Sequence, residues 1–342
     1  MKGVRRETAD GSRAALLARI VKLLRRGESV ALSGLPFVGK TVLAEKAIAK
    51  IAEDKDFIIC RCPVAEDLVK KGRAGNFSEL FFGEALKCLA KGSGCSWGDV
   101  PHLSRFERFI EALQDIGEYD GRRVIIFIDD FDALVANCRF EWNVGSLELI
   151  DEICAKLSYV IECGHRIVDD KTGLYSKRAF DVSVLLVSRL SPLMIECGQS
   201  YRSEDFSRLF RESAFVVKPM GVSEFNAFFR TAAKGRRISI AARDAIRRYS
   251  CGIPAVAESV IAAYDEKGRE SEKARFRKAV EKARLDCFAC RDSIRSALDL
   301  GIFEPERSGG LNLAVVRECG LSTAPAKYRG TFLDPFPKGA KD

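Results

Sequence analysis

Short apolar runs and amphipathic stretches alternate along the first two thirds of the chain. Runs without polar alternation are typical of parallel strands buried on both faces, whereas apolar residues at helical spacing indicate helices packed on a sheet. The predicted strands cover residues 28–33, 56–62, 123–128, 181–187 and 214–217, and the predicted helices cover 12–26, 42–49, 77–90, 103–117 and 145–161. This order predicts an α/β core with a parallel sheet.

The pattern becomes helical beyond Pro219 and Gly221, and we expect the first domain to end there. Two short strands around Ser308–Gly310 then indicate a hairpin, with Pro305 confining the first strand to an edge. Helices followed by a hairpin are typical of a winged helix. The predicted domains are a leader helix (1–26), an α/β core (27–218), a helical lid (219–265), a winged helix (266–321) and a C-terminal tail (322–342). The polar stretch 163–178 is expected to be a surface loop.

The segment Gly34–Thr41 reads GLPFVGKT and stands between a predicted strand and a predicted helix. This is the G-x-x-x-x-G-K-[ST] phosphate loop in the context that it requires. Glycines let the backbone turn its N–H groups inward, and the helix N-terminus favours an anion. Lys40 is predicted to reach the β- and γ-phosphates, and the Thr41 hydroxyl to bind Mg²⁺. The predicted nucleotide contacts from this segment are Gly34, Leu35, Pro36, Phe37, Val38, Gly39, Lys40, Thr41 and Val42.

A second informative segment is RVIIFIDD, residues 123–130, which resembles a Walker B strand. Ligands of open α/β sheets gather at the carboxyl ends of the strands, where these acidic side chains are expected. Asp129 is predicted to hold Mg²⁺ and Asp130 to orient the attacking water, with Asp132 as a helix cap. The alternative is a strand that ends in an ordinary acidic turn.

Basic residues near later strand ends are further candidates. Ser188 and Arg189 follow a buried strand and are predicted to emerge near Asp129 and sense the γ-phosphate; an ordinary surface arginine is the alternative. Arg208 or Arg211 is a candidate arginine finger toward a neighbouring subunit, against the simpler reading of a solvated helix face.

Composition narrows the class of protein. Apolar residues make up 47% of the chain and charged residues 30%, which is ordinary for a globular protein, and no apolar run reaches the length of a membrane helix. The basic N-terminus lacks the apolar run of a secretory signal. Twelve scattered cysteines indicate a reducing, cytoplasmic environment. The pair Cys287 and Cys290 has no second pair or histidine cluster to complete a zinc site, so structural packing is expected.

The net charge of +8 is uneven along the chain. Residues 228–300 carry seventeen Lys/Arg against ten Asp/Glu, and residues 1–26 carry eight against two. Basic ends around an acidic middle fit a polyanionic partner such as double-stranded DNA, but solvated helix faces give the same count.

Together these motifs resemble the STAND and archaeal-type ATPases among the AAA+-like P-loop proteins. Arg5-Arg6-Glu7 resembles a Gly-Arg-Glu box without its glycine, with Arg6 near the base, and Gly252-Ile253-Pro254 resembles the Gly-x-Pro motif of the helical lid. The resemblance implies a five-stranded sheet in the order 5-1-4-3-2, a lid whose Pro254 packs by adenine, and a winged helix. It also implies ATP and ADP, rather than GTP, as the nucleotides.

The leading hypothesis is an Mg²⁺-dependent ATPase that acts as a nucleotide-controlled switch, with Lys40, Asp130 and Arg189 in catalysis. The first alternative is a DNA-associated ATPase of the origin-binding or transposition type. The second is a scaffold that holds ADP without turnover. A homo-oligomer or a signalling partner fits each hypothesis, and the sequence identifies no trigger or client.

Overall fold

The computed structural model describes residues 13–34, 37–63, 77–98, 102–131, 145–164, 167–168, 175–177, 180–188, 209–210, 213–250, 252–265 and 270–283. The chain divides into two compact units. One unit comprises residues 1–33 and 41–215, and the other comprises 34–40 and 216–342. The domain boundaries expected from the sequence remain predictions.

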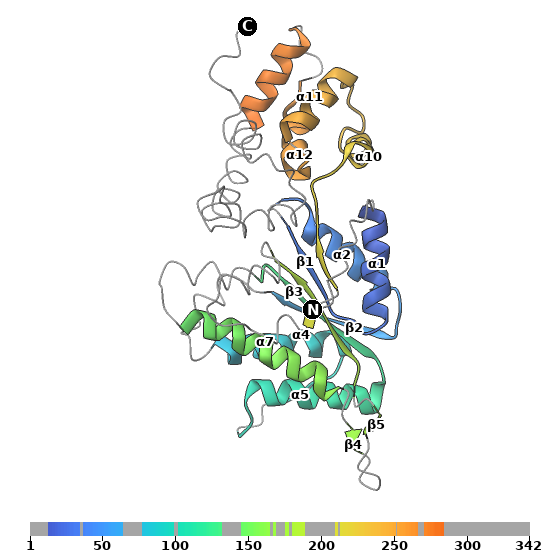
Figure 1. The fold of residues 1–342 in the computed structure, drawn as a ribbon, viewed down its shortest axis with the longest axis vertical. Coiled ribbons are helices and arrows are strands. Elements are labelled where there is room, and N and C mark those ends of the chain that lie inside the picture. Colours follow the sequence, from blue (N-terminus) through green and yellow to red (C-terminus); the bar gives the residue numbers. More distant parts are fainter. Residues whose placement is uncertain are drawn as a thin grey trace, which may run out of the picture. The chain divides into compact units, whose positions relative to one another are not determined.

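The first unit is built around a five-stranded sheet with the order β2-β3-β6-β1-β7 (Figure 1). Its strands are β1 (Val30–Ser33), β2 (Phe57–Pro63), β3 (Arg123–Asp129), β6 (Val182–Val187) and β7 (Ala214–Val216). The pairs β2–β3, β3–β6 and β6–β1 are parallel. Numbered along the chain, the five strands stand in the order 5-1-4-3-2, which confirms the predicted sheet.

Helices cover both faces of this sheet (Figure 1). They are α1 (Arg13–Arg25), α2 (Lys40–Ala52), α4 (Phe77–Ser93), α5 (Arg105–Asp115), which continues into the short π-helix η1 (Ile116–Asp120), and α7 (Gly145–Cys163). Successive side chains of β2 point to opposite faces of the sheet, so their contacts show which helix lies on which face. Arg61 forms an ion pair with Glu45 of α2, whereas the neighbouring Cys60 donates from its thiol to the carbonyl oxygen of Ala85 in α4.

Burial follows the position of each strand. Every residue of β1 and β6 is buried, as is the middle of β3, because each of these strands has a neighbour on both sides and helices on both faces. The edge strand β7 is partly exposed. The unbroken apolar runs in the sequence are therefore the signature of the central strands.

Two buried thiols lie on the α4 side of β2. The sulfur atoms of Cys60 and Cys62 are 3.6 Å apart, and both residues are free cysteines. The hydrogen bond with Cys60 and burial raise the pKa of the Cys62 thiol well above its ordinary value. A protonated, buried thiol packs as a small apolar group, so these cysteines belong to the core.

The structure corrects the expectation of a loop over residues 163–178. Ile167–Val168 (β4) and Tyr175–Lys177 (β5) form a small antiparallel sheet in which Val168 stands opposite Tyr175. These β-branched and aromatic residues favour cross-strand pairing, which the many polar residues around them concealed.

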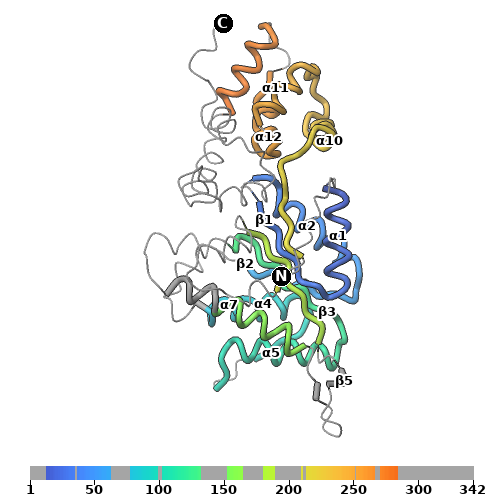
Figure 2. The backbone as a smooth tube through the Cα atoms, viewed as in Figure 1, coloured from blue at the N-terminus to red at the C-terminus, as the bar shows by residue number. Residues whose placement is uncertain are grey.

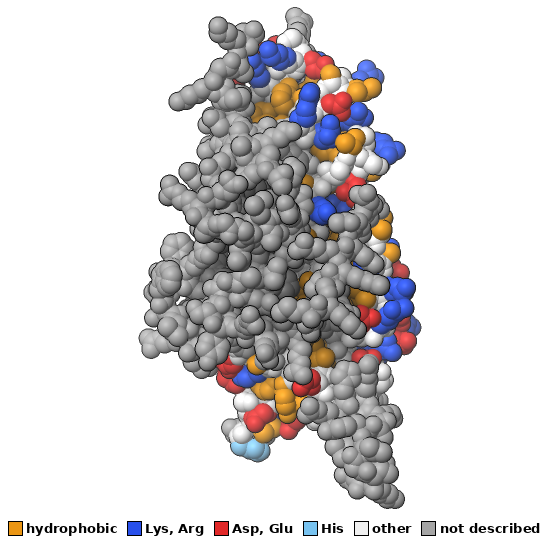
Figure 3. Space-filling model, viewed as in Figure 1, with side chains coloured by type: hydrophobic (Ala, Val, Ile, Leu, Met, Phe, Trp, Pro, Cys, Tyr) orange, Lys and Arg blue, Asp and Glu red, His pale blue; other side chains and the backbone are white. Residues whose placement is uncertain are grey.

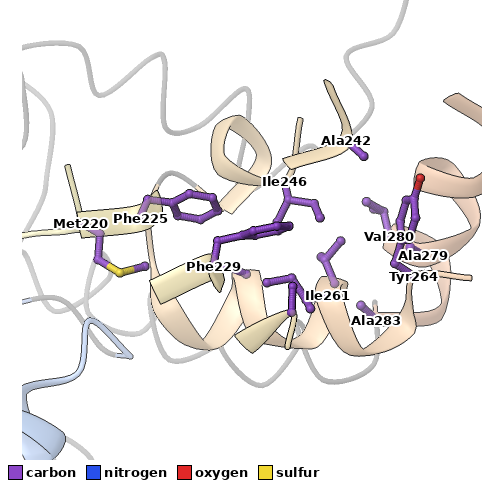
Figure 4. Packing of buried hydrophobic residues seen from close by; sticks show 13 residues of the cluster. Met220, Phe225, Phe229, Ala242, Ile246, Ile261, Tyr264, Ala279, Val280 and Ala283 are labelled. Atoms are coloured by element: carbon purple, nitrogen blue, oxygen red, sulfur yellow. The ribbon is translucent and has the colours of Figure 1, made fainter. Parts of the chain in front are cut away.

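The second unit contains the helices α10 (Val222–Ala232), α11 (Ile240–Ser250) and α12 (Pro254–Ala263), and residues 272–283 are also helical. Their apolar faces meet in one cluster (Figure 4), whose members include Phe225, Phe229, Ile246, Ile261 and Val280. The backbone tube in Figure 2 follows the chain from β7 into these helices. The predicted all-helical stretch after Gly221 is thus present.

The segment between α11 and α12 is fixed by its backbone. Gly252 has a φ of 77°, and its carbonyl oxygen accepts a 2.9 Å hydrogen bond from the Met220 N–H. A Cβ atom at Gly252 would lie 2.4 Å from the Met220 carbonyl oxygen. Pro254 is the first residue of α12, where its missing N–H costs no helical hydrogen bond. The Gly-x-Pro motif therefore has a local structural reason in this chain.

Several sequence predictions lie outside the described residues: the winged-helix hairpin, the tail and the pair Cys287 and Cys290. Within the described part of the chain, no helix combines the length and the apolar character needed to cross a membrane.

We expect the Gly252→Ala variant to unfold more easily than a matched control. Gly235 has a φ of 81° but an open space at its Cβ position, so Gly235→Ala tests the left-handed backbone alone. That backbone costs about 1–2 kcal/mol for a residue with a Cβ, and the contact with Met220 should add about 1–3 kcal/mol. Urea denaturation of both variants measures the difference. If Gly252→Ala and Gly235→Ala lose the same unfolding free energy, the backbone at Met220 moves away from the new Cβ without an energetic cost.

Candidate functional site

The loop between β1 and α2 has the backbone that a phosphate cradle requires. Gly34, Phe37 and Gly39 have φ angles of 140°, 64° and 89°. Between them, Val38 is fully buried and anchors the loop in the protein interior. Successive residues of opposite backbone hand turn N–H groups toward one side, which makes an anion-binding concavity.

Gly34 is required at the start of this loop for two reasons. Its φ lies in a range that residues with a Cβ rarely adopt, and a Cβ atom there would lie 2.6 Å from the carbonyl oxygen of Val217. The loop therefore passes directly over the backbone that follows β7. Residues Gly34–Lys40 accordingly group with the second unit, although the elements that flank them belong largely to the first.

Lys40 stands at the first position of α2, and the ammonium group points back into the loop. Its side chain is largely buried, and Nζ donates a 3.0 Å hydrogen bond to the carbonyl oxygen of Gly34. Moving an ammonium group out of water is costly unless it is paired. A buried ammonium at a helix N-terminus is the kind of group that pairs well with a phosphate.

The next residue connects the loop to the end of β3. The Thr41 hydroxyl donates to Oδ1 of Asp129 over 3.3 Å. The same carboxylate oxygen accepts the backbone N–H of Asp130 at 2.9 Å. Asp130 is exposed and has a φ of 52°, a conformation that Asp tolerates better than most residues. The predicted metal ligands Thr41 and Asp129 are therefore in direct contact.

The end of β6 lies between the ends of β1 and β3. The Phe131 N–H donates to the Val187 carbonyl oxygen at 3.0 Å, and the Ser188 N–H donates to the Leu32 carbonyl oxygen at 2.9 Å. Ser188 is buried, so its backbone continues the sheet. These bonds bring Ser188 to the same edge as Asp129, as its position in the sequence predicted.

The remaining candidates are distributed as follows. Val42 is 57% exposed on α2, and Pro254 belongs to the helical unit. The other candidates lie outside the described residues: Arg6, Leu35, Pro36, Asp132, Arg189, Arg208 and Arg211. Their predicted roles, like those of the residues described above, remain predictions.

Sequence reasoning missed the backbone conformation of Phe37 and Asp130. Among the described residues these two are the non-glycine positions with positive φ, and both lie at the candidate site. A sequence carries no direct signal for such a conformation when the residue is a phenylalanine. Aspartate adopts this region more readily than most residues, so the residue type at position 130 gave a weak signal for it.

The donor atoms at this edge suit one kind of metal. A hydroxyl oxygen and a carboxylate oxygen are hard ligands, and Mg²⁺ is commonly held by one or two protein ligands together with substrate phosphates and water. No cluster of three or more His, Cys, Asp or Glu side chains able to hold a metal occurs among the residues that the structure describes. Thr41 and Asp129 thus fit a magnesium ion bound jointly with a nucleotide.

Comparison with known proteins gives structural matches alone, since no family model and no curated protein matches the chain. The Walker-type ATPase PABY2304 of Pyrococcus abyssi is similar with a TM-score of 0.52 and 15% sequence identity, over 84% of this chain and 75% of that one. At this identity the likeness establishes the fold alone, which this chain shares with that ATPase.

Two further solved structures are more distant. Cdc6p of Pyrobaculum aerophilum is 12% identical with a TM-score of 0.48, over 93% of this chain and 96% of that one. The ORC2 protein of Aeropyrum pernix, in ADPNP–ADP complexes, is 13% identical with a TM-score of 0.49, over 89% and 83% of the two chains. At TM-scores below 0.5, these likenesses carry no weight for function.

Proposed function

We propose that this protein binds and hydrolyses ATP with Mg²⁺ and uses the nucleotide to control its conformation. The observation that carries the proposal is the hydrogen bond between Thr41 and Asp129. It joins a complete phosphate-loop motif to an acidic strand end that is far away in the sequence. A chance glycine-rich turn would have no reason to meet an acidic side chain there.

Binding of the phosphates follows from the loop. The backbone N–H groups of such a loop and the N-terminus of α2 would provide partial positive charge, and Lys40 would provide a full one. The ammonium group lies 3.0 Å from the Gly34 carbonyl oxygen, so a bound phosphate would exchange a neutral acceptor for an anionic one. Hydrogen bonds between charged partners are about twice as strong as neutral ones.

Chemistry would take place at the carboxyl ends of β3 and β6. Thr41 and Asp129 would hold Mg²⁺, which supplies charge neutralisation on the phosphates when it is bound. The exposed Asp130 carboxylate would orient a water molecule for attack. Ser188 and Arg189 would respond to the γ-phosphate at the end of β6. The preference for ATP over GTP, and the place of the chain among STAND proteins, rest on resemblance.

The grouping of the loop supports a switch. Residues Gly34–Lys40 form one compact unit with the helical segment, while β1 and most of α2 belong to the sheet unit. The phosphates of a nucleotide bound at the loop would therefore contact the unit to which the helical segment belongs. Loss of the γ-phosphate would remove contacts at the ends of β3 and β6. Such a loss is the usual origin of a nucleotide-dependent rearrangement.

The Lys40→Ala variant tests the proposal. Loss of a charge-assisted hydrogen bond should weaken ATP and ADP binding by about 10- to 150-fold. Lys46→Ala removes the same charge from an exposed position of α2 and should leave binding unchanged. Titration with a fluorescent ATP analogue measures both variants. Lys40→Ala protein that binds and hydrolyses ATP like the parent would contradict the proposal.

Asp129→Asn and Asp130→Asn form a matched pair that separates metal binding from water activation. Both remove one charge with little change in shape. Asp129→Asn should abolish the dependence of ATP binding on Mg²⁺, whereas Asp130→Asn should keep it and lower the hydrolysis rate by about 100-fold or more. Binding titrations with Mg²⁺ or EDTA, together with phosphate release, distinguish them. A parent protein that purifies with ADP and never releases phosphate would instead favour the non-hydrolysing scaffold.

A second candidate function is association with DNA, which the charge of the helical unit favours. The described residues from 222 to 283 include twelve Lys/Arg and seven Asp/Glu. In Figure 3, Lys and Arg side chains recur on the exposed surface of these helices, interspersed with acidic ones. Lys273 and Arg277 are both exposed and lie four residues apart on the same helix. Such a surface can contact successive phosphates.

Gel shifts with double-stranded DNA at low and moderate salt test this second function. Binding should fall steeply with salt, and Lys273→Glu/Arg277→Glu should weaken it at each salt concentration. Lys46→Glu/Lys50→Glu makes the same charge change at the same spacing on α2 and serves as the control. The absence of any shift at low salt would remove DNA as a partner.

A further inference from the structure

The phosphate loop contains one residue whose type conflicts with its conformation. Phe37 has a φ of 64°, between Gly34 and Gly39, which have positive φ as well. Glycine adopts such angles without a steric cost, but a residue with a Cβ does not. Asp130, the other described non-glycine residue of this kind, has a short polar side chain that eases the cost; a phenylalanine has no such help.

Packing of the ring does not explain the choice of residue. The Phe37 side chain is 40% exposed, whereas the neighbouring Val38 is fully buried. The conformation is held from both sides: Val38 anchors the loop, and the Lys40 ammonium group bonds to the Gly34 carbonyl oxygen. Phe37 therefore occupies an unfavourable backbone region that these neighbours help to hold.

We propose that Phe37 sets the nucleotide affinity of the loop by making its binding-competent conformation harder to hold. The inference rests on the proposed nucleotide binding. Backbone N–H groups turn inward where residues of opposite backbone hand follow one another, and Phe37 is one of the left-handed positions of this loop. A phenylalanine lowers the population of that conformation relative to glycine, and the apparent affinity falls by the same factor. A strained loop should also relax more readily while the nucleotide is bound, and we therefore expect faster release of ADP as well.

Three variants separate the backbone from the ring. Phe37→Gly relieves the backbone, Phe37→Ala removes the ring but keeps the Cβ, and Phe37→Asn introduces a residue that tolerates the conformation. Phe37→Gly should bind ADP about 5- to 30-fold more tightly and release it correspondingly more slowly. Phe37→Ala should stay within about twofold of the parent, and Phe37→Asn should fall between them.

Stopped-flow release of a fluorescent ADP analogue gives the rates, and thermal unfolding without nucleotide gives the stability of each variant. The proposal is supported if Phe37→Gly binds ADP most tightly and longest, Phe37→Asn comes next, and Phe37→Ala behaves like the parent. If Phe37→Ala binds ADP as tightly as Phe37→Gly, the proposal is overturned, because the ring and not the backbone would then be responsible. Phe37→Gly that gains thermal stability but binds ADP like the parent also overturns it, since the strain would then belong to the fold alone.

The parent protein separates this inference from the proposed function. If the parent and all three variants bind ADP equally well, the role of Phe37 is refuted and the proposed nucleotide site still stands. Parent protein that binds neither ADP nor ATP refutes the proposed function, and the role of Phe37 falls with it.

Discussion

The parallel pairing of β6 with both β1 and β3 is the constraint on which the candidate site depends. In a parallel sheet all carboxyl ends lie at one edge, so the residues that follow these three strands must be neighbours. The backbone bonds from Phe131 to Val187 and from Ser188 to Leu32 hold the three ends level. Thr41 and Asp129 can then meet, although 87 residues separate them in the chain. Slippage of one strand would move the acidic side chains away from the loop.

The loop itself depends on close backbone contacts rather than on side-chain packing. Gly34 lies against the Val217 carbonyl oxygen, and Gly252 lies against that of Met220. Both glycines contact the short segment that leads from β7 to α10, one from the loop between β1 and α2 and one from the turn between α11 and α12. This segment therefore carries two contacts that no other residue type could make.

The two non-glycine residues with left-handed backbone, Phe37 and Asp130, suggest what the site is built to do. Such positions persist only where the surrounding structure fixes them, and they are common at functional sites. Here one stands in the phosphate loop and the other beside the acidic strand end. The candidate site combines a largely buried lysine with a loop conformation that is costly for a residue with a Cβ.

The sequence by itself determined the elements and the chemistry. Unbroken apolar runs identified the central strands, because only strands covered on both faces need them, and GLPFVGKT with the Asp129–Asp130 pair predicted a phosphate-bearing ligand. It did not reveal the small sheet of β4 and β5, whose few apolar residues are surrounded by polar ones, and the strand order came from a resemblance rather than from the pattern. Only the tertiary structure decided that Thr41 touches Asp129 and that Phe37 adopts the backbone of a glycine. The first depends on a contact between distant segments and the second on the folded loop, and local residue preferences carry little information about either.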